Sequence, residues 1–189
     1  MNQAIFLDRD GVINENRADY VRTWEQVQFL PGVFDALRKL AGSDFAVVVV
    51  TNQSGVGRGL MAAETMRAIN DGIVARVQAE GGRIDAVYAC PHRPDEGCGC
   101  RKPRPGMLLQ AAADLQIDLG RSFLIGDAVT DVEAALGAGC RPLMVRSGRG
   151  QAQLSNLRVQ GYEAVPVVAD LSEAVELILA TSTHFARTT

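Results

Sequence analysis

The chain has 189 residues, of which 47% are hydrophobic, and this is enough to build the core of one globular domain. Its formal net charge is −3, its pI is near 5.4, and no dense run of Lys and Arg occurs, which argues against a nucleic-acid partner. There is no signal-peptide pattern, and no apolar run is long enough to cross a membrane. We therefore expect a cytoplasmic monomer that acts on a small molecule.

Short apolar runs, typical of buried strands, alternate with helical patterns along most of the chain. The predicted strands cover residues 4–7, 45–51, 86–89, 122–125, 142–145 and 165–168. The predicted helices cover residues 33–41, 63–79, 106–115, 131–137 and 171–179. This alternation predicts an α/β fold, a Rossmann-like three-layer sandwich around a mainly parallel sheet. We expect one domain over residues 1–180 and a loose tail over residues 181–189.

Two aspartates, Asp8 and Asp10, directly follow the first predicted strand. Strand alternation should place both carboxylates on one side and turn Arg9 away from them. One carboxylate can attack phosphorus while the other protonates the leaving oxygen. Gly11 permits a sharp turn beside them. The segment from Asp10 to Asn52 is too short to contain a large cap domain as well as a helix and a strand.

Three other segments bring polar groups to strand ends or loops. Thr51 can bind phosphate oxygens through its hydroxyl, and Lys102 supplies a positive charge. Asp127 follows Gly126 and can complete a Mg²⁺ site with Asp8. Asp131 lies about one helical turn later and can hold Lys102 or order the loop at Asp127. Because ligands bind beyond the carboxyl ends of parallel strands, these residues together predict a phosphoryl-transfer site.

Between the second and third of these segments, three sulfur ligands and one nitrogen ligand fall in a short window: Cys90, His92, Cys98 and Cys100. Four protein ligands complete a tetrahedral Zn²⁺ and leave no position for water, so we predict a structural zinc loop. A redox dithiol or a disulfide framework fits the spacing less well. Cys140 has no evident partner and is predicted to be a small buried residue. Zinc would fix the cations that follow the last ligand, Arg101 and Lys102.

The motifs Asp8-x-Asp10-Gly11, Thr51, Lys102 and Gly126-Asp127-x-x-x-Asp131 resemble the four motifs of the haloacid dehalogenase superfamily of phosphatases. The zinc loop followed by Arg101-Lys102-Pro103 resembles the branch that contains D-glycero-D-manno-heptose 1,7-bisphosphate 7-phosphatases and histidinol-phosphate phosphatases. The loop from Thr51 to Gly59 is similar to the heptose version, because Ser54 stands where the histidinol-phosphate enzymes place an acid. Ala128 departs from relatives that carry a basic substrate ligand after the metal-binding aspartate.

The resemblance implies that Asp8 is the nucleophile of an aspartyl-phosphate intermediate and that Asp10 is the general acid and then the general base. It implies that Thr51 and Lys102 hold the phosphoryl group, supported by Gly11, Gly126 and Asp131. Catalytic Mg²⁺ would be bound by Asp8, the Asp10 carbonyl and Asp127, and structural Zn²⁺ by the cysteine loop. The implied substrate-binding residues are Asn16, Asp19, Tyr20, Asn52, Gln53, Ser54, Arg58, Arg101 and Lys102, with Arg17 as a further cation.

The reaction so implied removes the C7 phosphate of a heptose 1,7-bisphosphate and leaves heptose 1-phosphate for nucleotide-activated heptose, used in lipopolysaccharide core or a related glycan. The motifs do not discriminate between the α and β anomers. The alternatives are a histidinol-phosphate phosphatase, a phosphotransferase that passes the phosphoryl group to an acceptor sugar, and a non-enzymatic zinc-stabilised binding module.

Overall fold

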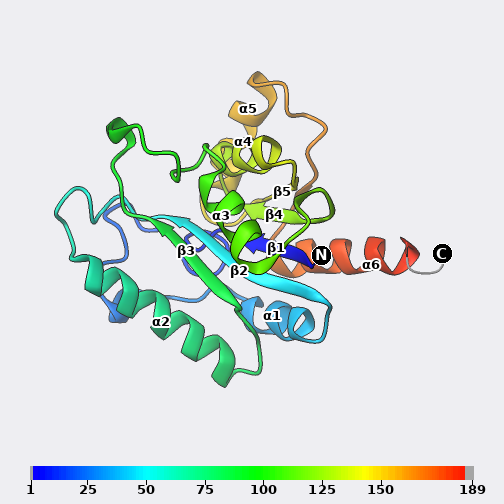
Figure 1. Ribbon diagram of the computed structural model, residues 1–189, viewed down its shortest axis with the longest axis horizontal. Coiled ribbons are helices and arrows are strands. Elements are labelled where there is room, and N and C mark those ends of the chain that lie inside the picture. Colours follow the sequence, from blue (N-terminus) through cyan, green and yellow to red (C-terminus); the bar gives the residue numbers. More distant parts are fainter. Residues whose placement is uncertain (1, 186–189) are drawn as a thin grey trace.

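Six parallel strands form the centre of the structure, a computed structural model that describes residues 2–185 (Figure 1). The strands are β1 (Gln3–Leu7), β2 (Phe45–Asn52), β3 (Ala86–Cys90), β4 (Phe123–Gly126), β5 (Arg141–Val145) and β6 (Val167–Val168). Their order across the sheet is β3-β2-β1-β4-β5-β6, and each neighbouring pair is parallel. The predicted Rossmann-like, mainly parallel sheet is therefore confirmed.

Helices cover both faces of the sheet and make the three layers (Figure 1). One face carries α1 (Val33–Ala41), α2 (Ala63–Ala79) and α6 (Leu171–Phe185), and the other carries α3 (Gly106–Leu115) and α4 (Val129–Ala138). A further helix, α5 (Gly150–Val159), packs beside α4 and β5. Short 3₁₀ turns occur at Trp24–Gln26, Pro94–Glu96 and Leu119–Arg121. Within residues 2–185 there is no inserted cap domain.

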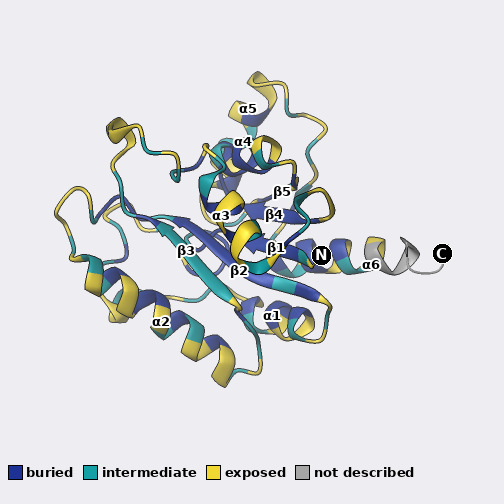
Figure 2. Cartoon of the chain, viewed as in Figure 1, coloured by how far each residue is buried: buried dark blue, intermediate teal, exposed yellow. Residues whose placement is uncertain are grey.

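Alternation along the strands divides the apolar side chains between two cores. Ile5 and Leu7 of β1 pack toward α1, α2 and α6, whereas Ala4 and Phe6 pack toward α3 and α4. Because both faces are covered, the central strands read as continuous apolar runs. Figure 2 shows the result: the central strands are mostly buried, the edge strand β3 is mostly intermediate, and the outer sides of the helices are exposed. None of the helices in the described part of the chain combines the length and apolar character needed to cross a membrane.

Three helices differ from the sequence-based expectations. Helix α5 was not predicted, because its sequence is polar and only Gly150 and Leu157 are buried along it. Helix α4 begins at Val129, ahead of the predicted start at Asp131. Helix α6 continues to Phe185, so the expected tail is wrong for residues 181–185, while residues 186–189 lie outside the described residues.

The strand order places the predicted site at a crevice. The chain runs from β1 to β2 and β3 on one side, then returns to β4 on the other side of β1. The carboxyl ends of β1 and β4 therefore diverge at a topological switch point, where open α/β sheets bind ligands. Asp8 follows β1 and Asp127 follows β4, so this crevice brings the two carboxylates together.

Replacing Phe6 by alanine should lower the free energy of unfolding by about 3–5 kcal/mol, because the fully buried ring would leave a cavity between β1 and the α3/α4 layer. The matched control is Val159→Ala at the end of α5, where the side chain is 85% exposed and a change within about 0.5 kcal/mol is expected. Urea denaturation of both variants measures the difference. A fall in the free energy of unfolding of less than about 1 kcal/mol for Phe6→Ala would contradict the packing of Phe6 in this core.

Candidate active site

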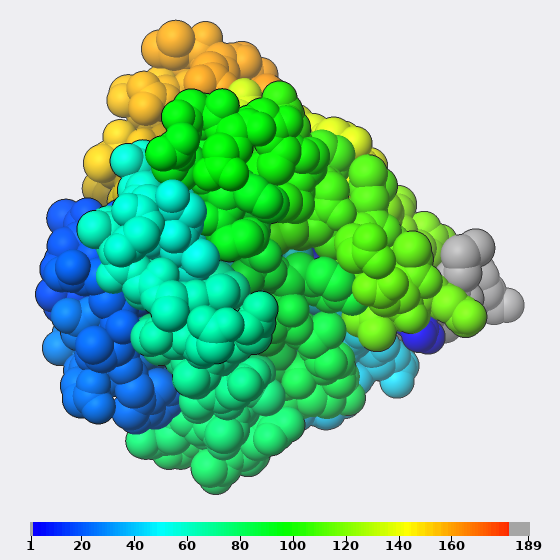
Figure 3. All heavy atoms as spheres, turned by 60° about the vertical axis from the view of Figure 1, so that its left-hand side comes forward, coloured from blue at the N-terminus to red at the C-terminus, as the bar shows by residue number. Residues whose placement is uncertain are grey.

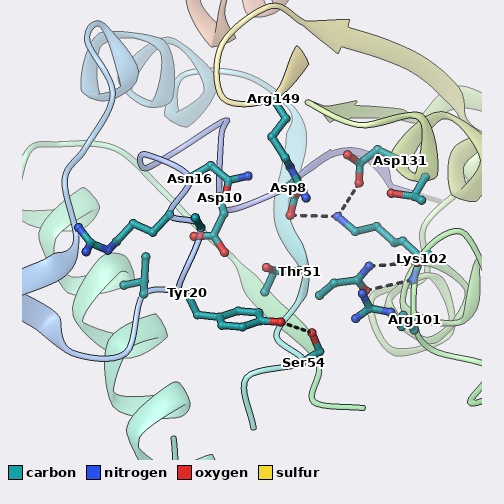
Figure 4. A pocket seen from close by; sticks show the side chains of 15 residues that line it. Asp8, Asp10, Asn16, Tyr20, Thr51, Ser54, Arg101, Lys102, Asp131 and Arg149 are labelled. Carbon is teal, nitrogen blue, oxygen red and sulfur yellow. Dashed lines mark hydrogen bonds and ion pairs between the residues drawn. The ribbon is translucent and has the colours of Figure 1, made fainter. Parts of the chain in front are cut away.

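A pocket of about 360 Å³ opens at the carboxyl edge of the sheet (Figure 4). Its walls come from the ends of β1 and β2, the flap over residues 14–31, the end of the cysteine loop, the start of α4 and the loop after β5. Figure 3 shows the flap, the loop after β2 and the cysteine loop side by side on the surface. The lining residues are Asp8, Asp10, Asn16, Arg17, Ala18, Tyr20, Val21, Thr51, Asn52, Ser54, Arg101, Lys102, Thr130, Asp131 and Arg149.

A buried ammonium lies between two carboxylates at the floor of this pocket (Figure 4). Lys102 Nζ is 2.9 Å from Asp8 Oδ1 and 2.6 Å from Asp131 Oδ1. Burial by itself would lower the pKa of Lys102, but the charges of Asp131 and Asp8 raise it to about 12. Burial raises the pKa of Asp8 to about 6; Lys102 acts against this rise, while Asp131 and Asp10 add to it. Lys102 is therefore an ammonium at neutral pH and Asp8 is mostly a carboxylate.

Lys102 is also held from β2. Its Nζ donates to the carbonyl of Val50 at 2.8 Å. The side-chain amide of Asn52 accepts from the Lys102 backbone N–H and donates to its carbonyl, at 3.1 and 3.0 Å. Asn52, predicted to bind substrate, thus lines the pocket but has its amide engaged with the backbone of Lys102. Val50 and Asn52 thus position Lys102 against the end of β2.

The carboxylate of Asp10 is surrounded by donors. Asn14 Nδ2 donates to Oδ1 and Gln53 Nε2 donates to Oδ2, both at 2.8 Å. The guanidinium of Arg9 donates to both oxygens, with Nη2 at 3.0 Å from Oδ1 and 2.9 Å from Oδ2. The expectation that Arg9 points away from the aspartates is therefore wrong. The strand ends at Leu7, and the chain turns tightly over residues 9–14, so strand alternation no longer applies at Arg9.

Asp127 fits the role of a cation ligand. Its side chain is fully buried; Oδ2 accepts from the backbone N–H of Arg149 at 2.8 Å, whereas Oδ1 has no hydrogen-bond partner within the described residues. Ligand oxygens of Asp8, Asp127 and Asp131 all lie within 4.8 Å of one another. Burial, together with the negative charge of Asp8, raises the pKa of Asp127. An unpaired buried oxygen in a carboxylate cluster is suited to Mg²⁺, which prefers oxygen ligands.

Two glycines make this close packing of carboxylates possible. Gly11 has φ +92°, and a Cβ at this position would lie 2.1 Å from Asp127 Oδ2. A Cβ at Gly126 would lie 2.3 Å from the side chain of Asp131. Asp131 also accepts from the Ala128 backbone N–H at 3.1 Å, so it contacts both Lys102 and the loop that follows Asp127.

The structure brings only part of the predicted substrate-binding set to the pocket. Asn16, Tyr20, Ser54 and Arg101 line it, and the Tyr20 hydroxyl lies 3.3 Å from Ser54 Oγ, joining the flap to the loop after β2. Asn52 and Lys102 line it as well. Three predicted residues do not: Asp19, which pairs with Arg17 and Arg22, Gln53, which donates to Asp10, and Arg58.

Sequence reasoning missed Arg149 and Thr130, which line the pocket as well. Arg149 follows β5, so the rule that polar groups gather at the carboxyl ends of parallel strands could have identified it. Its side chain is 58% exposed, and its Nε lies 3.6 Å from Asp127 Oδ2. Thr130 lies in the first turn of α4, where no motif marks it.

The four predicted zinc ligands form one cluster. Their sulfur atoms are 3.2 to 3.6 Å apart, and His92 Nδ1 is 3.5 and 3.3 Å from the sulfurs of Cys90 and Cys100. A disulfide needs about 2.05 Å, whereas sulfurs around tetrahedral Zn²⁺ with bonds of about 2.3 Å lie about 3.8 Å apart. Burial contributes most to raising the pKa of Cys90 to about 12, but the Arg101 backbone N–H and the other sulfurs lower that of Cys98 to about 7. The donor set therefore fits a metal better than a covalent bridge.

Comparison with known proteins identifies close relatives. A family model described as HAD-hydrolase-like matches residues 99–174. The D-glycero-β-D-manno-heptose 1,7-bisphosphate 7-phosphatase of Bordetella bronchiseptica is 39% identical over 177 residues, which is 94% of this chain and 98% of that protein. The protein of the same name from Pseudomonas putida is 43% identical over 152 residues, 80% of this chain and 87% of the relative.

A solved structure agrees with these relatives. The crystal structure of the D,D-heptose 1,7-bisphosphate phosphatase from B. bronchiseptica, complexed with magnesium and phosphate, superposes with a TM-score of 0.88 at 39% identity. The match covers 95% of this chain and 99% of that one. The chain therefore belongs to the D-glycero-D-manno-heptose 1,7-bisphosphate 7-phosphatase family of haloacid dehalogenase-like phosphatases.

Proposed function

We propose that this enzyme removes the C7 phosphate of D-glycero-β-D-manno-heptose 1,7-bisphosphate and leaves the 1-phosphate. The observation that carries the proposal is the pairing of buried Asp8 with Lys102 in a pocket that Asp10 also lines. The β anomer is proposed because the relatives from B. bronchiseptica and P. putida carry that name. Heptose 1-phosphate is a precursor suited to nucleotide activation, as for lipopolysaccharide core or a related glycan.

The chain's own residues account for both halves of the reaction. A carboxylate oxygen of Asp8 attacks phosphorus, and the bond from phosphorus to the C7 oxygen breaks while Asp10 gives that oxygen its proton. Asp10 then takes a proton from the water that attacks the aspartyl-phosphate, which releases phosphate and restores Asp8. Thr51 and Lys102 stabilise the phosphoryl oxygens during both steps.

Mg²⁺ would be held by the carboxylates of Asp8 and Asp127 and by the backbone carbonyl of Asp10. When bound, it supplies positive charge that reduces the repulsion between the Asp8 carboxylate and the phosphate dianion. The unpaired Oδ1 of Asp127 supports this assignment.

The charges at the pocket wall favour a substrate with a second phosphate. Arg17, Arg101 and Arg149 line the pocket beside Lys102, and planar guanidinium groups bind phosphate well. Arg149 supplies a cation beside Asp127, the residue that precedes Ala128, where the resemblance implies a basic residue. Histidinol phosphate carries an ammonium, which would lie among these cations. Ser54 stands where the histidinol-phosphate enzymes place an acid, so no carboxylate at that position would pair with the ammonium.

We also propose a single-domain, monomeric enzyme of the cytoplasm. One continuous sheet carries the whole pocket, which supports the single domain. The cysteines of the metal cluster are unpaired, which suits a reducing compartment.

The Asp8→Asn variant should lose at least about 10³-fold in Mg²⁺-dependent phosphate release, because an amide cannot form the aspartyl-phosphate. Wild type and variant are assayed with both anomers of heptose 1,7-bisphosphate and with histidinol phosphate, and ³¹P NMR identifies the phosphate removed. Asp44→Asn is the matched control, since Asp44 is exposed and lies outside the pocket.

We expect wild type and control to prefer the β heptose and to release its C7 phosphate. Preference for histidinol phosphate would contradict the proposed substrate but keep the chemistry. Transfer of the phosphoryl group to a sugar in excess of phosphate release would contradict hydrolysis, and full activity of Asp8→Asn would contradict the proposed nucleophile.

We propose that the cysteine cluster binds one structural Zn²⁺. Metal content should be about one zinc per chain, and Cys98→Ala should lose the zinc because three ligands hold it too weakly. Lys102 lies two residues after the ligand Cys100, so phosphatase activity should fall with the metal. Cys140→Ala, which removes a cysteine outside the cluster, should retain the zinc. Equal zinc content in both variants, measured by inductively coupled plasma mass spectrometry, would contradict the assignment.

Stabilisation by Mg²⁺ should increase with pH between about 5 and 7.5. In the absence of metal, the pKa of Asp8 is raised to about 6 in the folded protein. Protonation of Asp8 therefore stabilises the folded state at low pH, and this stabilisation is lost as the pH rises through about 6. Mg²⁺ competes with a proton below pH 6 but meets a free carboxylate at pH 7.5. The shift in Tm on adding Mg²⁺ is therefore expected to be larger at pH 7.5, and to disappear in Asp127→Asn. Equal shifts at the two pH values would count against Asp8 as a ligand.

A further inference from the structure

Arg9 is the largest fully buried side chain of the protein's described part and does not line the pocket. Only 1% of Arg9 is exposed, and its Nε and Nη2 donate to the two oxygens of the Asp10 carboxylate. Such a paired arrangement fixes the orientation of a carboxylate as well as its position. Asn14 and Gln53 donate to the same group, so three side chains restrain the Asp10 carboxylate together.

The other end of the guanidinium is anchored to helix α2. Arg9 Nη1 donates to Asn70 Oδ1 at 2.8 Å, across a buried contact between segments far apart in the sequence. Asn70 lies on the buried stripe of α2, among Ile69, Ile73 and Val77. A polar side chain on an apolar stripe needs a partner, and Arg9 provides it.

Helix α2 holds the flap as well. The Trp24 ring lies against Gly72, where an added Cβ would come within 2.7 Å of it. Helix α2 therefore contacts both the flap, which carries Asn16 and Tyr20 into the pocket, and Arg9, which holds Asp10.

We infer that Arg9 and Asn70 are positioning residues for the general acid and base, and that α2 is the element from which Asp10 is aimed. Neither side chain lines the substrate pocket, so the Arg9 and Asn70 side chains reach it through the Asp10 carboxylate. Without the acceptor at Asn70, the Arg9 guanidinium loses its second anchor and restrains the Asp10 carboxylate less firmly. The inference rests on the proposed phosphomonoester hydrolysis but not on the identity of the sugar.

The test compares Asn70→Leu, which keeps the shape but removes the acceptor oxygen, with Asn70→Asp, which keeps the oxygen. Ile73→Val, on the same buried stripe, is the control for loosened packing of α2. For each protein, kcat and KM are measured by phosphate release from heptose 1,7-bisphosphate and from phenyl phosphate, and thermal unfolding shows whether it folds.

We expect Asn70→Leu to lose roughly 10- to 100-fold in kcat with KM within about threefold, because a misdirected acid–base group slows chemistry without weakening binding. Asn70→Asp should recover kcat to within about threefold.

A folded Asn70→Leu variant with wild-type kcat would overturn the inference, as would an equal loss in Asn70→Asp or in Ile73→Val, or a loss confined to KM. A wild-type enzyme that hydrolyses phenyl phosphate but not the heptose would count against the proposed substrate alone, and the inference is then judged on phenyl phosphate.

Discussion

One buried ammonium connects the parts of the chain that form the active site. Lys102 contacts Asp8 after β1, Asp131 in α4 and the Val50 carbonyl in β2. A charge that is only 2% exposed is tolerated because these partners replace its water. If either carboxylate were removed, the other charges would remain buried and unbalanced, which is far more costly than the loss of a surface ion pair. The catalytic geometry and the stability of this edge of the sheet thus depend on the same contacts.

The cysteine cluster explains how the lysine reaches this position. It lies in a long loop after β3, and a loop without a core of its own cannot hold a side chain at ångström precision. Bound metal would remove most of the freedom of that loop immediately before Arg101 and Lys102. The Asn52 amide then fixes the Lys102 backbone from β2. With metal bound as proposed, the loop and the Asn52 amide would restrain the lysine from two directions.

The pocket separates its charges by function. At the floor, negative groups and Lys102 surround the place where phosphorus reacts, and at the wall Arg17, Arg101 and Arg149 are exposed to the substrate. With no cap domain in the described residues, the flap and these arginines define the space left for the sugar. In the proposed function, a heptose with phosphates at both ends would place one phosphate at the floor and the other among the cations at the wall.

The sequence by itself determined the parallel sheet, the zinc-type cluster and the motif residues Asp8, Asp10, Thr51, Lys102 and Asp127. These depend on local information: an apolar run predicts a buried strand, and residues that follow parallel strands share one edge of the sheet. Cysteines close in sequence are also close in space. The helical residues 181–185 of α6 and helix α5 were missed where local patterns are weak.

Only the tertiary structure decided the direction of Arg9, its partner Asn70 and the entry of Arg149 and Thr130 into the pocket. It also excluded Asp19, Gln53 and Arg58 from the lining. Sequence alternation placed Arg9 opposite Asp10, but a turn after Leu7 reversed it. The direction of a long side chain outside regular structure depends on which distant donor or acceptor is buried beside it, and periodicity along the chain carries no information about that partner.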